Sequence, residues 1–317
     1  MAIPWMPAFG GLSKITRSFS HCDAVFDPTV CDPLNNADLT LILNVGLQQV
    51  NPAGGAATGS FNDSDSNPVP IKRWTNGAWN HWKKNFRETA QRFWHGRFWL
   101  VNNFPSYLVQ LHHGILYRHN VWCRFRLNVS DALPGGSYHH TIQVVRVDPS
   151  SSFRSHWTLY STNDTRFETL GYDSKGKAIQ QKSHVHEIGH LLGMDHSSVG
   201  HFSCLPSGDT NQTACYGVND RDKYSVMGTG MRRYPEHAYP WRKAMADISG
   251  AGTVRELPTV RLAKEVAGAL AAISGTTPGP VPAMDWEPKQ KRHYPRTWDE
   301  AQRGIAITKR PTRNMGP

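Results

Sequence analysis

Three histidines within eleven residues place the strongest constraint on what this 317-residue chain can fold into. The segment HEIGHLLGMDH sets His186, Glu187, His190, Gly193 and His196 at the spacing H-E-x-x-H-x-x-G-x-x-H. Residues four apart share one face of a helix, so the first two histidines can present ring nitrogens to a single metal ion. The glutamate lies about 100° further around that helix, where its carboxylate can reach a water molecule at the metal.

The third histidine requires the helix to end before it. Gly193 can adopt a positive φ, which stops a helix with a sharp turn and would carry His196 back beneath the metal. Three neutral imidazoles leave a fourth tetrahedral position open, as in a catalytic zinc site. The pattern should arise by accident in roughly one in ten thousand chains of this composition. The alternatives are a helix with fortuitous polar residues and a metal site kept only for stability.

Periodicity around this motif predicts a layered α/β (α+β) domain built on a twisted mixed sheet. A helix is expected from Thr75 or Asn76 to a stop at Gly96, with tryptophan and phenylalanine at helical spacing on one face. Most of the 11 tryptophans would therefore serve core packing. A shorter helix is expected from Pro240 to Gly250, and an alanine-rich one over 260–273. Strands are expected at 37–50, 98–102, 121–129 and 141–147, with 157–161 and 166–172 forming a further hairpin or an edge.

Residues 184–197 resemble the zinc-binding signature of the metzincin clan of metalloproteases, and within that clan they are most similar to the matrixin branch. A second hallmark of that clan is a methionine in a tight turn beneath the zinc, and Tyr-Ser-Val-Met-Gly offers Met227 at such a turn, 31 residues after His196. The resemblance implies a metzincin-like catalytic domain with a backing helix, an active-site helix and a smaller irregular C-terminal subdomain. The expected division is an irregular segment 1–36, an upper subdomain 37–193, a lower subdomain 194–257, and a helix with a basic proline-rich tail over 258–317.

The resemblance also implies the activity, that of a zinc-dependent endopeptidase with a zinc-bound water as nucleophile. Glu187 would be the general base, and His186, His190 and His196 the ligands of one catalytic Zn²⁺. An edge strand in the 139–172 region would align an extended protein or peptide substrate by backbone pairing. Thr229 stands where some branches carry a zinc-facing tyrosine, so no tyrosine ligand is assigned. Candidate Ca²⁺ ligands, which compete with simple solvation, are Asp63, Asp65, Asp164 and Asp173.

The five cysteines leave alternatives open. Cys22 with Cys31, and Cys204 with Cys215, are close in turn-rich sequence and suit two small disulfide loops, although an all-reduced chain is the alternative. Cys123 lies in a strand and is expected to be a buried free thiol. The resemblance also implies a possible zymogen form, because matrixin-like zymogens keep an N-terminal cysteine thiolate bound to the zinc. The Cys-Asp-Pro segment that begins at Cys31 could supply that thiolate, but a disulfide is favoured.

The net charge and the absence of targeting signals limit the classes of protein to which this chain could belong. The net charge of +10 is spread along the chain without any nucleic-acid-binding signature, and no apolar run is long enough to span a membrane. The first residues lack a secretory signal, so we expect secretion after signal removal, or delivery by a signal-independent route. The alternative functions are a protease toxin delivered into other cells, whose partner would be an inhibitor or immunity protein, and an inert metzincin-like binding module. We expect a monomer.

Overall fold

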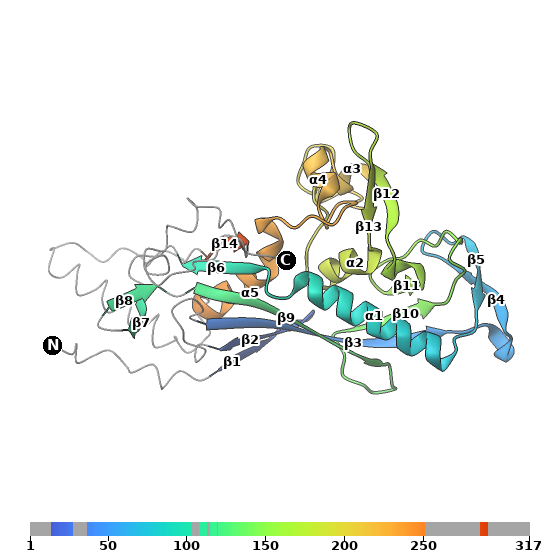
Figure 1. Ribbon diagram of the computed structural model, residues 1–317, viewed down its shortest axis with the longest axis horizontal. Helices are drawn as coiled ribbons and strands as arrows, with labels where there is room; N and C mark the ends of the chain where they lie inside the picture. Colours follow the sequence, from blue (N-terminus) through green and yellow to red (C-terminus); the bar gives the residue numbers. More distant parts are fainter. Residues whose placement is uncertain are drawn as a thin grey trace.

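The computed structural model describes residues 14–27, 37–102, 108–112, 115–118, 120–250 and 286–290 (Figure 1). Its helices are α1 (Asn76–Trp94), α2 (Ser183–Leu191), α3 (Thr213–Tyr216), α4 (Asp220–Tyr224) and α5 (Tyr239–Gly250). Its strands are β1 (Ile15–Ser18), β2 (Asp23–Asp27), β3 (Ala37–Val50), β4 (Thr58–Asn62), β5 (Pro68–Lys72), β6 (Phe98–Asn102), β7 (Leu108–His112), β8 (Ile115–Arg118), β9 (Asn120–Asp131), β10 (His140–Val145), β11 (Leu159–Ser161), β12 (Glu168–Tyr172), β13 (Ala178–Gln181) and β14 (Trp286–Gln290).

A mixed sheet of eight strands forms the base of the molecule. Its order is β1-β2-β3-β9-β6-β14, and β10 pairs with the second half of β3 and carries β11 on its outer side. The 14-residue strand β3 is central, since it runs parallel to β9 and β10 and antiparallel to β2. This arrangement confirms the predicted mixed α/β architecture and is compatible with the α+β class.

One face of the sheet is packed by helices, and α1 is the main one. Along β3 the inward side chains from Leu39 to Leu47 are buried and alternate with more exposed ones, as expected for a sheet with one covered face. The side chain of Thr75 accepts a hydrogen bond from the first turn of α1, and Gly96 follows the helix at φ +64°. The buried stripe of α1 confirms the predicted packing face; it comprises Trp79, Trp82, Phe86, Ala90 and Trp94.

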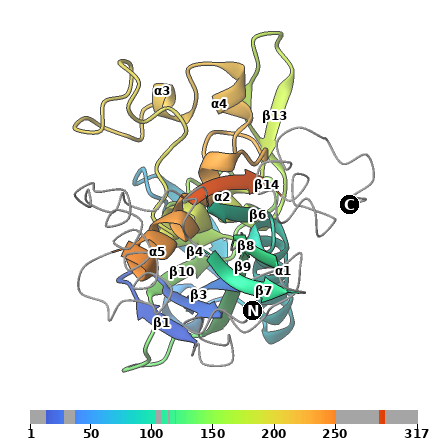
Figure 2. The same ribbon diagram turned by 90° about the vertical axis from the view of Figure 1, so that its left-hand side faces the viewer.

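Helix α2, which carries the histidine motif, packs against α1. Trp94 Nε1 donates to the carbonyl oxygen of Val185 at 3.3 Å, and the rings of Phe86 and His184 lie 5.6 Å apart between centroids. Strand β13 ends two residues before α2 begins. Figures 1 and 2 both place β13, α3 and α4 on the same side of the molecule, beyond α2. The motif helix is therefore held between the sheet-backing helix and a region of loops and short helices.

Several expectations need correction at the chain ends. Residues 1–36 are not irregular throughout, because β1 and β2 form an antiparallel hairpin that joins the edge of β3. The basic tail contributes β14, which pairs antiparallel with β6. The predicted helix over 260–273 lies outside the described residues. Segments 157–161 and 166–172 do not pair with each other: β11 is an edge strand beside β10, and β12 forms a hairpin with β13.

The cysteines divide into one disulfide and two free thiols. Cys204 and Cys215 are bonded, as one of the two predicted pairs requires. Cys22 is a buried free thiol, so the predicted bond to Cys31 is not formed; Cys31 itself lies outside the described residues. Cys22 precedes β2 in the inward alternation with Ala24, so its sulfur faces the core, and burial raises its pKa to about 12. Cys123 is buried and free, as predicted.

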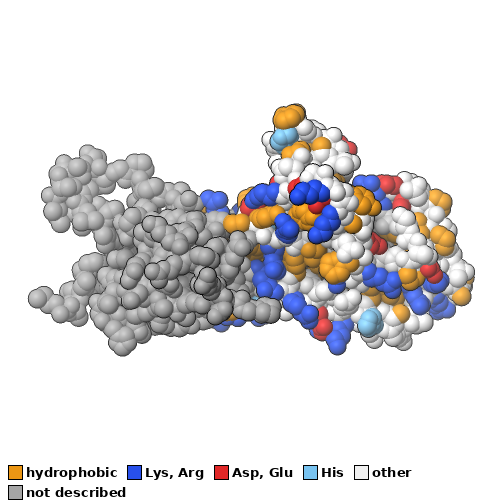
Figure 3. Space-filling view, turned by 45° about the horizontal axis from the view of Figure 1, so that its top comes forward, with side chains coloured by type: hydrophobic (Ala, Val, Ile, Leu, Met, Phe, Trp, Pro, Cys, Tyr) orange, Lys and Arg blue, Asp and Glu red, His pale blue; other side chains and the backbone are white. Residues whose placement is uncertain are grey.

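Within the part of the chain that the structure describes, no helix has the length and apolar character needed to cross a membrane. On the face shown in Figure 3, lysine and arginine side chains are scattered among acidic and apolar ones. The positive charge is thus dispersed there, as the sequence suggests.

Candidate metal centre

The three motif histidines converge because α2 ends where the spacing predicts. His186 and His190 lie on one face of α2, and Gly193 follows the helix at φ +85° with its N–H donating to the His190 carbonyl at 2.8 Å. The positive φ turns the chain sharply, so His196 comes back to the same point. Its Nε2 lies 3.0 Å from His190 Nε2, which is also 3.0 Å from His186 Nε2.

The other ring nitrogen of each histidine identifies the tautomer. His186 Nδ1 lies 2.8 Å from the carbonyl oxygen of Val226, and His190 Nδ1 lies 2.8 Å from that of Met194. His196 Nδ1 lies 2.7 Å from the carbonyl oxygen of Thr210. A carbonyl oxygen can only accept, so each Nδ1 carries the hydrogen and each Nε2 presents a lone pair.

This arrangement fits a metal ion. Three lone pairs that face one another across about 3 Å repel unless a cation lies among them, and tetrahedral zinc with bonds of about 2.05 Å places its ligand nitrogens about 3.3 Å apart. Burial is the main cause that lowers the pKa of His186 well below its ordinary value and that of His196 to about 4. Both rings are therefore neutral at neutral pH, which is the form that binds metal. Among the described residues, these three histidines are the one group of His, Cys, Asp or Glu found close enough to hold an ion.

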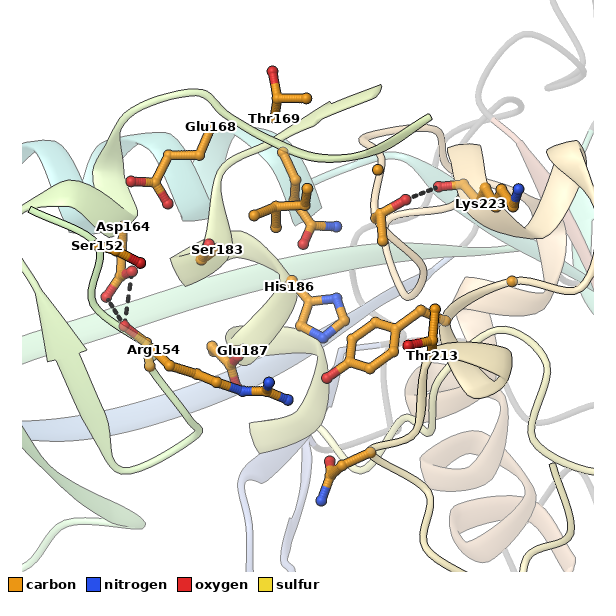
Figure 4. Close-up of a pocket in the computed structure, with 18 of the residues that line it drawn as sticks. Ser152, Arg154, Asp164, Glu168, Thr169, Ser183, His186, Glu187, Thr213 and Lys223 are labelled. Atoms are coloured by element: carbon orange, nitrogen blue, oxygen red, sulfur yellow. Dashed lines mark hydrogen bonds between the residues drawn. The ribbon is translucent and has the colours of Figure 1, made fainter. Parts of the chain in front are cut away.

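Glu187 and His186 line a cleft of about 980 Å³. Figure 4 shows Glu187 and His186 side by side on the floor of this cleft, with Asp164 and Glu168 towards one end. Burial, and then the negative charge of Asp164, raise the pKa of Glu187 to about 8. A cation held by the histidines would lower that pKa towards the range suited to a general base at neutral pH.

A turn built around Met227 supports the centre from below. The Met227 side chain packs on α2 at Gly189, where an added Cβ would lie 2.3 Å from the methionine sulfur. Met227 N donates to Ser225 Oγ at 3.1 Å, and the ring of His237 lies 2.9 Å from the same oxygen. The turn also supplies the Val226 carbonyl that orients His186. The predicted methionine therefore lies against the motif helix.

Gln181 is a residue of this site that sequence reasoning missed. Its buried side-chain amide donates to the carbonyl oxygens of Val226, Gly228 and Gly230 at 3.0, 3.0 and 2.7 Å. The amide thus ties the methionine turn to the strand that leads into α2. The signal in the sequence is weak: Gln181 is one of two adjacent glutamines, and nothing local shows that it faces inward.

The candidate calcium ligands are occupied by hydrogen bonds. Asp63 accepts from the backbone N–H groups of Asp65 and Asn67, and Asp173 accepts from those of Lys175 and Lys177. These hydrogen bonds stabilise turns, so a role in turn formation at the solvated surface is favoured over calcium binding at these positions.

Asp164 is buried and accepts from Ser155 Oγ and from the Ser161 N–H. Burial raises its pKa to about 7, and both of its carboxylate oxygens already accept hydrogen bonds.

Comparison of the chain with protein-family models, with curated proteins and with solved structures gives no match. The case for this site therefore rests on its own geometry.

Proposed function

We propose that this chain is a zinc-dependent endopeptidase of the metzincin type. The observation that carries the proposal is the convergence of three hydrogen-free Nε2 atoms, one of them from His186, which lines the same cleft as Glu187. A structural zinc site would normally present a fourth protein ligand, and within the described residues the group that could hold an ion contains three. An open fourth position next to an acid suits catalysis.

His186, His190 and His196 would hold the zinc, and their Nδ1–H bonds to carbonyl oxygens would keep the rings oriented. A zinc ion held there supplies two things: it acidifies water and polarises a carbonyl group. The mixed sheet, the backing helix α1, the motif helix α2 and the methionine turn follow in the order that the metzincin resemblance implies.

Glu187 would perform the proton transfers. Its carboxylate takes a proton from the attacking water while the water oxygen bonds to the scissile carbonyl carbon. The same carboxyl group then gives the proton to the departing nitrogen as the carbon–nitrogen bond breaks. Glu187 directly follows His186 in the chain and lines the same cleft, so its carboxylate would lie near a water bound at the metal.

The cleft also has a surface on which an extended peptide could lie. Residues of β12 line it, and β13 is the one described strand paired with β12, so the opposite edge of β12 can pair with a substrate backbone. We propose Glu168–Tyr172 rather than β11 as the substrate-aligning edge expected in the 139–172 region, because β12 lines the cleft.

Metal analysis together with a peptide-library digest tests the proposal. Wild-type protein should contain one zinc per chain and cleave peptides, and Glu187→Gln should keep the zinc while losing at least about 100-fold in turnover. Glu88→Gln, which makes the same change on exposed α1 surface, is the matched control. Zinc binding without cleavage by the wild type would favour the inert binding module. Equal turnover of the wild type and Glu187→Gln would contradict the mechanism. The alternative of a protease toxin involves the same chemistry, and it differs only in that the protein would act inside other cells.

A further inference from the structure

The loop closed by the Cys204–Cys215 disulfide lies between the third histidine and the methionine turn. We call residues 204–216, which include the tyrosine directly after Cys215, the disulfide loop. Its two cysteines are fully buried, whereas residues 205–209 and 211–213 are exposed. A loop with so few buried side chains gains little from packing, so its conformation depends on its ends and its hydrogen bonds.

This loop makes two contacts with the metal-binding histidines. The carbonyl oxygen of Thr210, in the middle of the loop, accepts the Nδ1–H of His196 at 2.7 Å. Tyr216, which directly follows Cys215, lays its ring against His196 at 3.9 Å between centroids and against His186 at 5.8 Å. The loop thus determines both the tautomer and the ring plane of His196.

Backbone hydrogen bonds join both ends of the disulfide loop to the chain that leaves His196, and the disulfide joins these two ends to each other. The Ser198 N–H donates to the Cys215 carbonyl at 3.0 Å, and the Gly200 N–H donates to the Cys204 carbonyl at 2.9 Å. Opening the sulfur–sulfur bond would leave the exposed loop held mainly by these few backbone hydrogen bonds. The entropy released by the free loop would then oppose the placement of Thr210 and Tyr216.

We propose that the disulfide loop positions His196, so that full zinc affinity requires the Cys204–Cys215 bond. The inference rests on the proposed zinc centre and adds a redox dependence to it. In a reducing compartment, two thiols would supply two electrons and two protons, leave as their own disulfide, and convert Cys204 and Cys215 to thiols. The protein would then bind its metal more tightly in an oxidising compartment than in a reducing one.

Zinc affinity, measured by competition with a chromogenic chelator, tests this inference without reference to activity. Cys204→Ser/Cys215→Ser should bind zinc about 10- to 100-fold more weakly than the wild type, the usual cost of losing support around a metal ligand. Cobalt substitution gives a second readout, because a distorted ligand set changes the visible absorption of the bound ion. Phe202→Ala is the matched control: its side chain is 83% exposed beside the same loop.

Two further variants separate the aromatic contact from general stability. Tyr216→Ala should lose about tenfold in zinc affinity, and Tyr216→Phe, which keeps the ring, should stay within about twofold of the wild type. These variants retain the disulfide, so they test the support that Tyr216 gives to His196 even if the double serine variant fails to fold.

The outcomes distinguish the two proposals. A wild type that binds no zinc overturns both the zinc centre and the loop's role. A wild type that binds zinc, with a folded double serine variant or Tyr216→Ala within threefold of it, overturns the loop's role alone.

Discussion

Gln181 offers the sharpest test of how the candidate metal centre is supported. Its side-chain amide is 2% exposed and shares two N–H groups among three carbonyl oxygens of the methionine turn, those of Val226, Gly228 and Gly230. Gln181→Leu would keep a side chain of similar size and remove both donors. At least two buried carbonyl groups would then lack a partner, at about 1–3 kcal/mol each.

We therefore expect Gln181→Leu to lower the free energy of unfolding by about 2–4 kcal/mol, after allowing for the apolar contacts of leucine. At about 2–4 °C per kcal/mol, the midpoint of thermal unfolding should fall by about 5–15 °C. Zinc affinity should fall as well, because the Val226 carbonyl that accepts from His186 belongs to the loosened turn.

The neighbouring residue provides the control. Gln180 lies on the same strand and faces solvent, so Gln180→Leu should change the free energy of unfolding by less than about 0.5 kcal/mol. Urea unfolding of both variants and the wild type measures the difference directly. Equal effects of the two substitutions would refute the reasoning that the Gln181 amide holds the turn.

Two further predictions concern the turn and its surroundings. Gly228→Ala should lower the free energy of unfolding in urea by about 3 kcal/mol, because its Cβ would lie 2.1 Å from the Asp222 carbonyl oxygen and 2.4 Å from that of Tyr216. The control is Gly77→Ala, which has open space around it and should not destabilise the protein. Similar free energies of unfolding for the two variants would contradict this prediction. His237 has its pKa lowered to about 4 by burial and then by the charges of Arg221 and Arg233. Below pH 6.5 the unfolded chain binds a proton that the folded one does not, so His237 should cost stability as the pH falls towards 4, by about 1.4 kcal/mol per pH unit. The stability advantage of the wild type over His237→Gln should therefore shrink from pH 7 to pH 4, and an advantage independent of pH would contradict the assignment.

The local patterns predicted the elements that depend on neighbours in the chain. Helix α1 begins after Thr75 and ends before Gly96, as its capping residue and its apolar spacing require. The convergence of His186, His190 and His196 is likewise local, since one helix and one glycine turn within eleven residues are enough to bring it about. Such features follow from helical geometry, whatever the rest of the fold does.

Elements that depend on partners far along the chain were predicted less well. The β1–β2 hairpin and β14 have short or proline-containing sequences, and their strand character comes from pairing with β3 and β6. Cys22 and Cys31 are close in the chain, yet Cys22 faces the core because β2 pairs with β3. Strand formation depends on such pairing more than on intrinsic preference.

The three imidazoles, the carboxylate and the glycine turn between them can be recognised from the sequence alone. The groups around them come together only in the folded protein, namely the carbonyl oxygens of Val226 and Thr210, the Gln181 amide and the Tyr216 ring. The reason is physical, because a ligand spacing is a property of one helix, whereas a hydrogen bond between residues tens of positions apart exists only once the sheet, the helices and the loops have packed.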